Sequence, residues 1–502
     1  MSYTLFSKAA KSSNSSAGLI LKADAWWIPR LAGPVIAAAI IRLAMMIVTI
    51  ARYGEESLFQ GDTISYLEPG RNLLFHGHFF ADGVPDLVRT PGYPLFLAIT
   101  DLAGAPVAAL ANVILSVLAV VLVWKLAKTV FLDGRIALGA AWIFAFEPVA
   151  ISCSFLLLSE PLFLVLFLLG LQQVAEFLRS QKLRALAIAG TCLAAATFVR
   201  PLTYYLVIAL ALGLFFLLAL LPRLPFQKKR LTAADHGLWW KAPALLLVTS
   251  LPWIGAWQMR NWIEAGYAGL SSATEINLYF QIASGVTARV EHKPFIDVRK
   301  QYGYSDFANN SGQSYQFPTY LAQHPEQTGW TQGQRLAFMH AESLKIVRAH
   351  PEEYLKTSLI SLFRTMFIPG SQFFDRIWSP NNWNQKSVAY GDEKRWTILP
   401  SEIGLWAGAE RAVFLFALLT LYLLAVRGFW RSIGHNLCVW LLLGTALYFV
   451  AATGVGEEPG GNMRYRLPFM PILCILASAG FGAKRNLGTD ADPQLFPGPR
   501  SI

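Results

Sequence analysis

The stretch VAALANVILSVLAVVLVW, residues 107–124, carries no charged side chain anywhere along its length. About 17–25 predominantly apolar residues in helical conformation are enough to cross the hydrocarbon core of a bilayer. Charge-free runs of the same kind recur along the chain, at residues 201–222, 243–259, 436–456 and 467–483. These runs predict an all-α polytopic membrane protein.

The composition of the whole chain agrees with that prediction. Of the 502 residues, 54% are hydrophobic and 15% are charged, whereas ordinary soluble chains carry roughly 25% charged residues. The net charge of +11 would suggest a nucleic-acid partner in a polar protein, but here the lysines and arginines gather in short loops between apolar segments. A soluble enzyme, a disordered chain and a nucleic-acid-binding module are therefore excluded.

Hydropathy places the membrane spans, and the basic loops orient them. Lysine and arginine are enriched in the cytoplasmic loops of membrane proteins. If the chain starts inside, every short basic loop returns to the inside. We expect about ten spans, at residues 31–51, 105–129, 135–152, 157–178, 184–201, 202–221, 242–260, 407–427, 435–454 and 467–484.

This topology divides the chain into five parts. They are a cytoplasmic tail (1–30), a transmembrane module (31–260) with a first outer loop (52–106), an extracytoplasmic cap (261–406), C-terminal transmembrane helices (407–485) and a second cytoplasmic tail (486–502). The segments at 94–103 and 354–367 are apolar but too short or too interrupted to span, so we expect juxtamembrane helices at the outer interface. The polar cap has weak periodicity, which predicts an irregular fold with short helices, the clearest at 334–350.

Charged side chains at the ends of apolar spans are costly unless they find a partner or water. In this topology a set of them shares the outer face: Asp62, Arg89, Glu160, Arg200, Arg260, Arg464 and Arg466. An arginine at the end of a span often only reaches for the headgroups, and for Arg200 and Arg260 that alternative stays open. Arginines that only anchor a helix in the headgroups would occur at both faces of the membrane. The position of all these charges at one face therefore favours a polar site. Elsewhere we expect a structural role for Arg42 and a solvated turn at Glu147.

Two motifs in the first outer loop indicate chemistry. The loop reads GDTISY at 61–66 and, after a polar stretch, RTPGYPLFLA at 89–98. An aspartate after glycine is commonly a helix cap, but here Asp62 lies beside the membrane with Tyr66 one turn later. Shorter motifs follow along the chain: SEPLF at 159–163, VRP at 199–201, PW at 252–253, RN at 260–261, HP at 350–351 and RYRLP at 464–468.

In this order, over about residues 30–485, the motifs resemble those of the GT-C membrane glycosyltransferases. The likeness is to the branch that uses polyprenol-phosphate sugars, which includes protein O-mannosyltransferases, the lipid A aminoarabinose transferase and the rhizobial core galacturonosyltransferases. The mannosyltransferases carry a paired Asp-Glu in the first loop, whereas here Thr63 follows Asp62. The resemblance implies a GT-C-like helical bundle.

The resemblance also implies the roles of the site residues, with Asp62 as the catalytic carboxylate. Sugar transfer from a polyprenyl phosphate needs a base for the proton of the acceptor and cations for the leaving phosphate, and arginine suits phosphate. The candidates for substrate and donor binding are Tyr66, Arg89, Tyr93, Glu160, Arg200, Arg260, Asn261, Arg464, Tyr465 and Arg466. Beyond the lipid-linked sugar donor, a divalent metal ion stays open as a cofactor, because Asp62 is able either to take a proton or to bind a cation that positions the phosphate.

These expectations combine into one function. The protein would move a sugar from an undecaprenyl-type phosphate carrier to an extracytoplasmic glycolipid or cell-envelope glycan, with inversion, at the outer face of a bacterial plasma (inner) membrane. Two alternatives stay open. One is an O-antigen polymerase or ligase, and the other is a non-enzymatic transporter or flippase for a lipid-linked sugar, for which internal repeats and charges at the membrane midplane would be expected.

Overall fold

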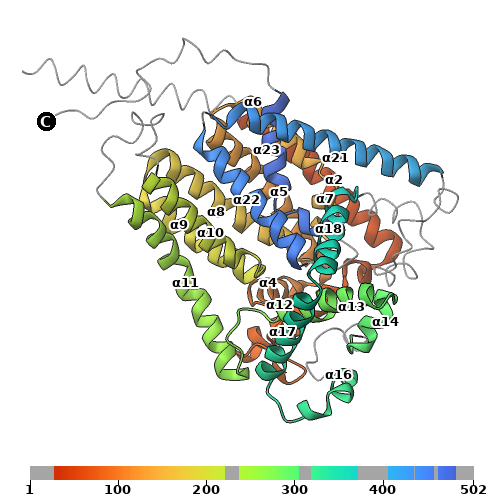
Figure 1. Cartoon of the computed structure of the whole chain (residues 1–502). Helices are drawn as coiled ribbons and strands as arrows, with labels where there is room; N and C mark the ends of the chain where they lie inside the picture. Colours follow the sequence, from red (N-terminus) through yellow and green to blue (C-terminus); the bar gives the residue numbers. More distant parts are fainter. Residues whose placement is uncertain are drawn as a thin grey trace, which may run out of the picture.

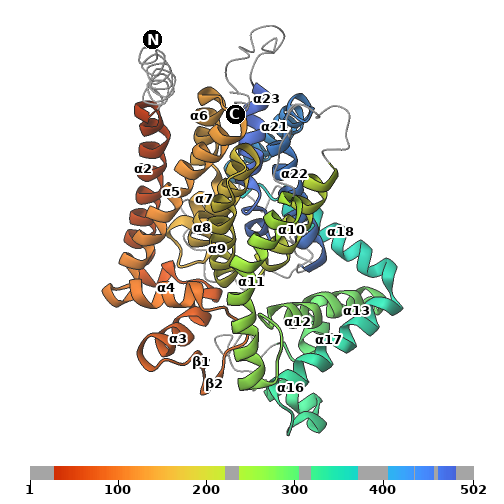
Figure 2. The same ribbon diagram turned by 90° about the vertical axis from the view of Figure 1, so that its left-hand side faces the viewer.

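The computed structural model describes residues 28–220, 237–304, 318–370, 405–434, 436–456 and 462–481. The two predicted cytoplasmic tails lie almost entirely outside these residues, as does part of the predicted cap. Figures 1 and 2 show a bundle of long helices with a smaller layer of helices and loops at one end. The predicted helical fold class is confirmed.

The long helices form the bundle. They are α2 (Ile28–Tyr53), α5 (Ala105–Phe131), α6 (Gly134–Ala145), α7 (Pro148–Phe155), α8 (Glu160–Ser180), α9 (Leu183–Val199), α10 (Thr203–Leu220), α11 (Leu238–Ala265), α21 (Leu405–Ser432), α22 (Leu437–Gly456) and α23 (Met470–Phe481). Helix α11 runs along the side of the bundle and reaches into the layer at its end (Figure 2). The predicted outer segment therefore begins on a helix that continues past residue 260.

The layer at the end of the bundle comes from two parts of the chain. The first outer loop supplies η1 (Glu55–Leu58), α3 (Gly61–His76), β1 (Phe80–Ala81), β2 (Val84–Pro85), α4 (Gly92–Thr100) and η2 (Asp101–Ala103). The cap supplies α12 (Ala273–Asn277), η4 (Leu278–Ala283), α13 (Ser284–Val290), α14 (Phe295–Gln301), α16 (Pro318–Gln323), η5 (Pro325–Gln327), α17 (Gln332–Ala349) and α18 (Pro351–Phe367). A last short helix, η8 (Met463–Arg466), precedes α23.

This layer is more regular than the sequence suggested. The described part of the cap is mainly helical, and α17 and α18 coincide with the helices expected at 334–350 and 354–367. The strands β1 and β2 form a two-stranded antiparallel hairpin in which Phe80 pairs with Pro85. Helix α18 connects the cap to the bundle (Figure 2).

Each of the ten predicted spans falls on a helix or helix pair of the bundle. Among the described residues, five helices are long and apolar enough to cross a membrane, namely α2, α5, α8, α21 and α22, and the bent pair α6 and α7 makes a sixth if it counts as one span. The other predicted spans fall on the shorter helices α9, α10 and α23 and on α11, which contains Pro243 and Pro252. The chain is a multi-pass membrane protein, and its described part contains fewer helices of full spanning length than the ten expected.

Helix α8 lies at the centre of the bundle. It packs against α5 on one side and α9 on the other, and 67% of its most apolar window is buried, compared with 17% for α21. Its first residue, Glu160, is 1% exposed. The central helix therefore begins with a buried carboxylate at the end of the bundle that faces the layer.

The span expected at 135–152 is broken between α6 and α7, which meet at an angle of 59°. The solvated turn predicted at Glu147 is wrong, because this side chain is buried and caps α7 by accepting a hydrogen bond from the N–H of Ala150. Arg42 donates to the carbonyl oxygen of Ala145 over 2.9 Å, at the end of α6 where helical partners run out. The structural role predicted for Arg42 is confirmed.

Candidate active site

Asp62 lies in the first turn of α3, and the start of this helix is tied to the bundle. The hydroxyl of Thr63 donates to the carbonyl oxygen of Leu157 over 2.8 Å and accepts from the N–H of Gln60 over 2.9 Å. The N–H of Leu157 in turn donates to the carbonyl oxygen of Leu58. Because Leu157 lies just before α8, these bonds hold Asp62 next to the beginning of the central helix.

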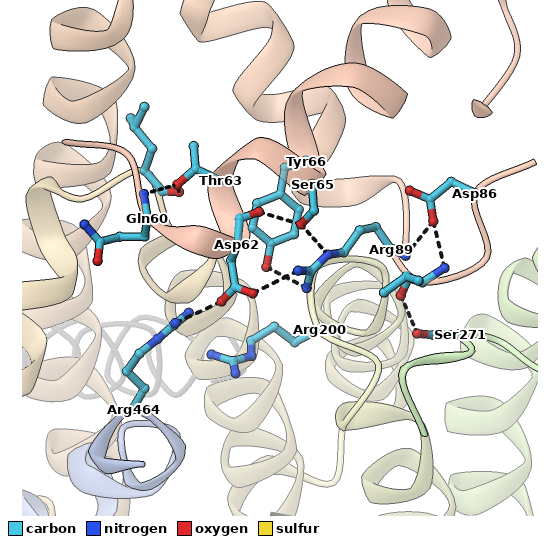
Figure 3. Close-up of polar contacts among 12 residues, drawn as sticks. Gln60, Asp62, Thr63, Ser65, Tyr66, Asp86, Arg89, Arg200, Ser271 and Arg464 are labelled. Atoms are coloured by element: carbon cyan, nitrogen blue, oxygen red, sulfur yellow. Dashed lines mark hydrogen bonds and ion pairs between the residues drawn. The ribbon is translucent and has the colours of Figure 1, made fainter. Parts of the chain in front are cut away.

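The carboxylate of Asp62 is held between two arginines (Figure 3). Its Oδ1 accepts a hydrogen bond from Nη2 of Arg89 over 2.9 Å, and its Oδ2 accepts one from Nη1 of Arg464, also over 2.9 Å. Arg89 lies between β2 and α4, whereas Arg464 lies in η8, near the other end of the chain. The Asp62 side chain is still 35% exposed, so a ligand is able to reach it.

Ser65 and Tyr66 set the position of Arg89. Its Nε donates to the hydroxyl of Ser65 over 2.8 Å, and Nη1 donates to the hydroxyl of Tyr66 over 3.3 Å. The guanidinium carbon lies 4.4 Å from the centre of the Tyr66 ring, a distance suited to cation–π attraction. Tyr66 meets the buried ring of Tyr93 edge-on at 4.9 Å, and the Tyr93 hydroxyl accepts from Asn112 on α5 over 3.1 Å.

Glu160 joins Arg464 to Arg200. Its Oε1 accepts from Nε of Arg464 over 2.7 Å and lies 2.9 Å from Nη1 of Arg200. The Arg200 guanidinium lies 5.9 Å from the ring centre of Tyr465. Arg464 thus uses two nitrogens of its planar group to bridge Asp62 and Glu160, a geometry that lysine cannot reproduce.

The cluster formed by Asp62, Arg89, Glu160, Arg200 and Arg464 contains more positive than negative charge. Burial alone would raise the pKa of Asp62, but the charges of Arg89 and Arg464 and the hydrogen bonds they donate hold it well below its usual range. The two arginines therefore favour the ionised form of Asp62. The excess of one guanidinium, over two carboxylates, favours binding of an anion.

The structure does not bring Arg260, Asn261 and Arg466 into contact with this cluster. Arg260 donates to the carbonyl oxygens of Phe79 and Asp86, over 2.6 and 3.0 Å. Asn261 is buried and donates to backbone carbonyls in the chain that follows α11. Arg466 is 1% exposed and donates to backbone carbonyls at the end of α18. These three side chains bind backbone.

Sequence reasoning missed three residues that complete the site. Ser65 and Asn112 hold Arg89 and Tyr93, as described above, and the buried Asp86 accepts hydrogen bonds from the N–H groups of Val88 and Arg89. A signal existed for Asn112, because it is an amide inside the apolar stretch at 107–124. For Asp86 the sequence offered no signal, since six other acidic residues lie in the same outer loop.

A divalent cation does not fit this cluster well. Both oxygens of Asp62 already accept hydrogen bonds from arginines, and a third guanidinium lies on Glu160. Within the described ranges, no group of three or more His, Cys, Asp or Glu side chains is placed to hold a metal ion. The residues around Asp62 suit an anionic group such as a phosphate better than a metal.

The described residues form a helical membrane bundle with three clustered arginines at one end. Residues 91–254 match the family model described as "Dolichyl-phosphate-mannose-protein mannosyltransferase". The match includes Glu160 and Arg200 but begins after Asp62 and Thr63. It confirms the resemblance to the GT-C membrane glycosyltransferases that the motifs predicted. No curated protein matches the chain.

Solved structures of an oligosaccharyltransferase from Archaeoglobus fulgidus resemble the chain in outline. The apo form shows 14% identity and a TM-score of 0.47, and covers 90% of this chain and 50% of its own. The form named AglB, in complex with an inhibitory peptide and a dolichol-phosphate, shows 14% identity and a TM-score of 0.43, with the same coverage. A complex with Zn and sulfate shows 13% identity and a TM-score of 0.35, and covers 87% of this chain and 53% of its own. This chain spans about half the length of these proteins, and at such TM-scores the likeness carries no functional argument.

Proposed function

We propose that this protein transfers one sugar from a polyprenyl phosphate of the undecaprenyl type to an extracytoplasmic acceptor, a glycolipid or a cell-envelope glycan. The observation that carries the proposal is the carboxylate of Asp62, partly exposed and held between Arg89 and Arg464 at the end of a membrane bundle. A lipid-linked donor brings its phosphate to this depth without a nucleotide-binding loop. The family match at 91–254 supports a glycosyltransferase, and the donor and acceptor are our assignment.

The chemistry follows from the residue types. The acceptor hydroxyl oxygen forms a bond to the anomeric carbon while the bond from that carbon to the phosphate oxygen breaks. The electron pair of the broken bond leaves with the phosphate, which Arg89, Arg200 and Arg464 stabilise as its negative charge develops. The proton of the acceptor hydroxyl passes to Asp62. Attack on the face opposite the phosphate inverts the anomeric carbon.

Donor binding and base activity are coupled in this scheme. With both oxygens paired to guanidinium groups, Asp62 is a weak base because its pKa is held low. A phosphate that takes hydrogen bonds from Arg89 and Arg464 competes with the carboxylate for the same nitrogens, and its negative charge opposes theirs. The pKa of Asp62 then rises toward its usual value. The carboxylate therefore becomes a better base when the donor is in place.

The two alternatives are less well supported. A transporter for a lipid-linked sugar is expected to carry its binding charges near the midplane, whereas the arginine cluster lies where α8 begins, at one end of the bundle. An O-antigen polymerase or ligase needs no carboxylate between arginines in its first outer loop. We also assign the site to the periplasmic side of a bacterial inner membrane, because that side is free of the basic loops.

The test is release of undecaprenyl phosphate by the purified full-length protein in lipid nanodiscs, where no gradient exists. The probes are undecaprenyl phosphates carrying a hexose, a pentose, an aminopentose or a uronic acid, with water or a lipid extract of the envelope as acceptor. An enzyme releases undecaprenyl phosphate from at least one of them. Binding without release, together with movement of the lipid between the leaflets of sealed vesicles, would contradict the proposal and favour the flippase.

A further inference from the structure

The residues just before Arg89 form a tight turn built on Asp86. Its Oδ1 accepts hydrogen bonds from the N–H groups of Val88, over 2.7 Å, and Arg89, over 3.1 Å. Its own N–H donates to the carbonyl oxygen of Phe79 over 3.1 Å. The side chain is fully buried. Asp86 therefore holds the backbone of Arg89 without contacting Asp62 (Figure 3).

Arg260 braces the same turn from the end of α11. Its guanidinium spans the carbonyl oxygens of Asp86 and Phe79, over 3.0 and 2.6 Å. The group also pairs with Glu264 one turn later on α11, over 2.6 Å, and lies 5.0 Å from the ring centre of Trp257. These contacts fix the orientation of the Arg260 guanidinium.

The cap holds the turn from a third direction. The hydroxyl of Ser271 donates to the carbonyl oxygen of Val88 over 2.6 Å (Figure 3). The N–H of Ser272 donates to the carbonyl oxygen of Leu87 over 2.7 Å. Both serines are buried. The backbone from Asp86 to Arg89 is therefore fixed by its own side chain, by α11 and by the cap.

We propose that Asp86 is a positioning residue that aims the guanidinium of Arg89 at Asp62, and that Arg260 and Ser271 hold the Asp86 turn in place. The cap is thereby coupled to one of the two arginines that pair with Asp62. For Arg260 this replaces donor binding with an indirect role. The consequence for catalysis rests on the function proposed above, whereas the positioning itself does not.

The burial of Asp86 agrees with this role. Burial raises the pKa of Asp86 to about 6, although the two N–H bonds and the charges of Arg89 and Arg260 act in the opposite direction. Among the described residues, the carboxyl of Asp86 bonds only to the N–H groups of Val88 and Arg89, through Oδ1. Its lack of exposure excludes contact with a substrate.

The test measures how fast the arginine-selective reagent phenylglyoxal modifies Arg89 in the full-length protein, by peptide mapping with mass spectrometry. The exposed Arg71, which is 57% exposed, serves as an internal standard. Asp86→Ala should raise the rate at Arg89 roughly tenfold, equivalent to about 1.4 kcal/mol. Asp86→Asn keeps an acceptor for both N–H groups and should rescue the protection. Asp82→Asn, in the exposed hairpin turn, is the matched control.

Two further variants keep the inference testable if Asp86→Ala does not fold. Arg260→Lys keeps the charge beside Glu264 but lacks the two separate nitrogens that bond the carbonyls of Asp86 and Phe79, and Ser271→Ala removes the bond to Val88. Each should raise the Arg89 rate while leaving the Arg71 rate unchanged. An unchanged Arg89 rate in all the folded variants would overturn the positioning role.

A second measurement separates this inference from the proposed function. Binding of undecaprenyl phosphate should weaken roughly tenfold in Asp86→Ala, and should weaken no further when the same change is made in an Arg89→Ala background. Additive losses would contradict action through Arg89. If the unmodified protein binds no undecaprenyl phosphate but the labelling results hold, the positioning stands and the proposed donor is wrong.

Discussion

Arg464 is the residue that joins the two carboxylates of the site. It donates from Nη1 to Asp62 and from Nε to Glu160, so its planar group fixes the distance between the first outer loop and the central helix. It reaches the site from η8, about four hundred residues after Asp62. Replacement by lysine keeps the charge but removes the second hydrogen bond.

We expect Arg464→Lys to weaken the binding of undecaprenyl phosphate by roughly 10–100-fold, which corresponds to about 1.4–2.8 kcal/mol. Isothermal titration or fluorescence quenching in nanodiscs measures this affinity. Arg71→Lys is the control, because Arg71 also pairs with a carboxylate in the outer layer, that of Asp101, but lies outside the cluster. An unchanged affinity in Arg464→Lys would show that the arginine does not bind phosphate.

Asp86 makes a prediction about pH. Its pKa in the folded protein is about 6, above the value of about 3.9 in an unfolded chain. A carboxyl whose pKa is raised by folding stabilises the protein fully below its unfolded pKa, and this contribution is lost as the pH rises through the folded pKa. Asparagine does not titrate.

The melting temperature of the unmodified protein, relative to that of Asp86→Asn, should therefore rise as the pH falls from about 8 to about 5. Other groups contribute equally to both proteins and cancel in the difference. Intrinsic tryptophan fluorescence during heating gives both values. A difference that stays constant with pH, or falls on acidification, would mean that Asp86 is not raised to about 6.

At the scale of elements, the site depends on the close approach of α4 to the end of α9. A Cβ at Gly92 would lie 2.6 Å from the carbonyl oxygen of Phe198 and 3.0 Å from Cγ2 of Val199. Gly92 lies three residues after Arg89, and Phe198 lies two residues before Arg200. The absence of a side chain at Gly92 thus sets the spacing between two of the cluster's arginines.

Gly92→Ala should cost roughly 1–3 kcal/mol of stability, because the obstructing atoms belong to the backbone and overpacking is relieved only by a shift of the helix. We expect a lower melting temperature and slower release of undecaprenyl phosphate in the folded fraction. Gly213→Ala is the matched control, since nothing lies within 4 Å of a Cβ there and alanine favours helix. Equal melting temperatures for the two variants would contradict the close packing.

The sequence allowed some elements to be predicted and not others, for a physical reason. Charge-free runs locate helices because the bilayer requires length and apolarity, so α2, α5 and α8 were found. The break between α6 and α7 was not found, because the burial of Glu147 depends on which helices pack around it. Likewise, Asp62 was predicted because it lies in the GDTISY motif, whereas Asp86 is distinguished from the other acidic residues of the loop only by its burial.

At the scale of the whole molecule, orientation in the membrane determines which substrates reach the cluster. The basic loop between α8 and α9 should be cytoplasmic, and the cap should be outside. The prediction places Lys182 and Ala322, both exposed, on opposite sides. The chain has four cysteines, of which Cys192 is the one that is not buried.

In a Cys192→Ala background, Ala322→Cys should react with a membrane-impermeant thiol reagent in intact cells, and Lys182→Cys should react only after the cells are permeabilised. Mass shift on a gel reports the reaction. Labelling of Lys182→Cys in intact cells, with Ala322→Cys protected, would reverse the topology and place the arginine cluster at the cytoplasmic face.

The arrangement of the whole chain also explains why the arginines could not all be assigned from their spacing. Arg200, Arg260, Arg464 and Arg466 all lie at ends of apolar segments on the same side. Only the fold distinguishes those that meet Asp62 or Glu160 from those that bind backbone carbonyls. Spacing along the chain places these arginines at the ends of apolar segments, whereas the direction of a side chain depends on which helices pack together.

Asp62 is the proposed base, and Asp62→Asn tests this role. Asparagine is nearly isosteric but is unable to take a proton, and a general base typically contributes roughly 10²–10⁴-fold to rate. Release of undecaprenyl phosphate should fall by at least roughly 100-fold, while affinity for undecaprenyl phosphate stays equal or increases because Arg89 and Arg464 are freed. Asp82→Asn should retain full activity. If Asp62→Asn keeps more than about a tenth of the unmodified rate, the loss is below the smallest effect expected of a base, and Asp62 does not act as the base.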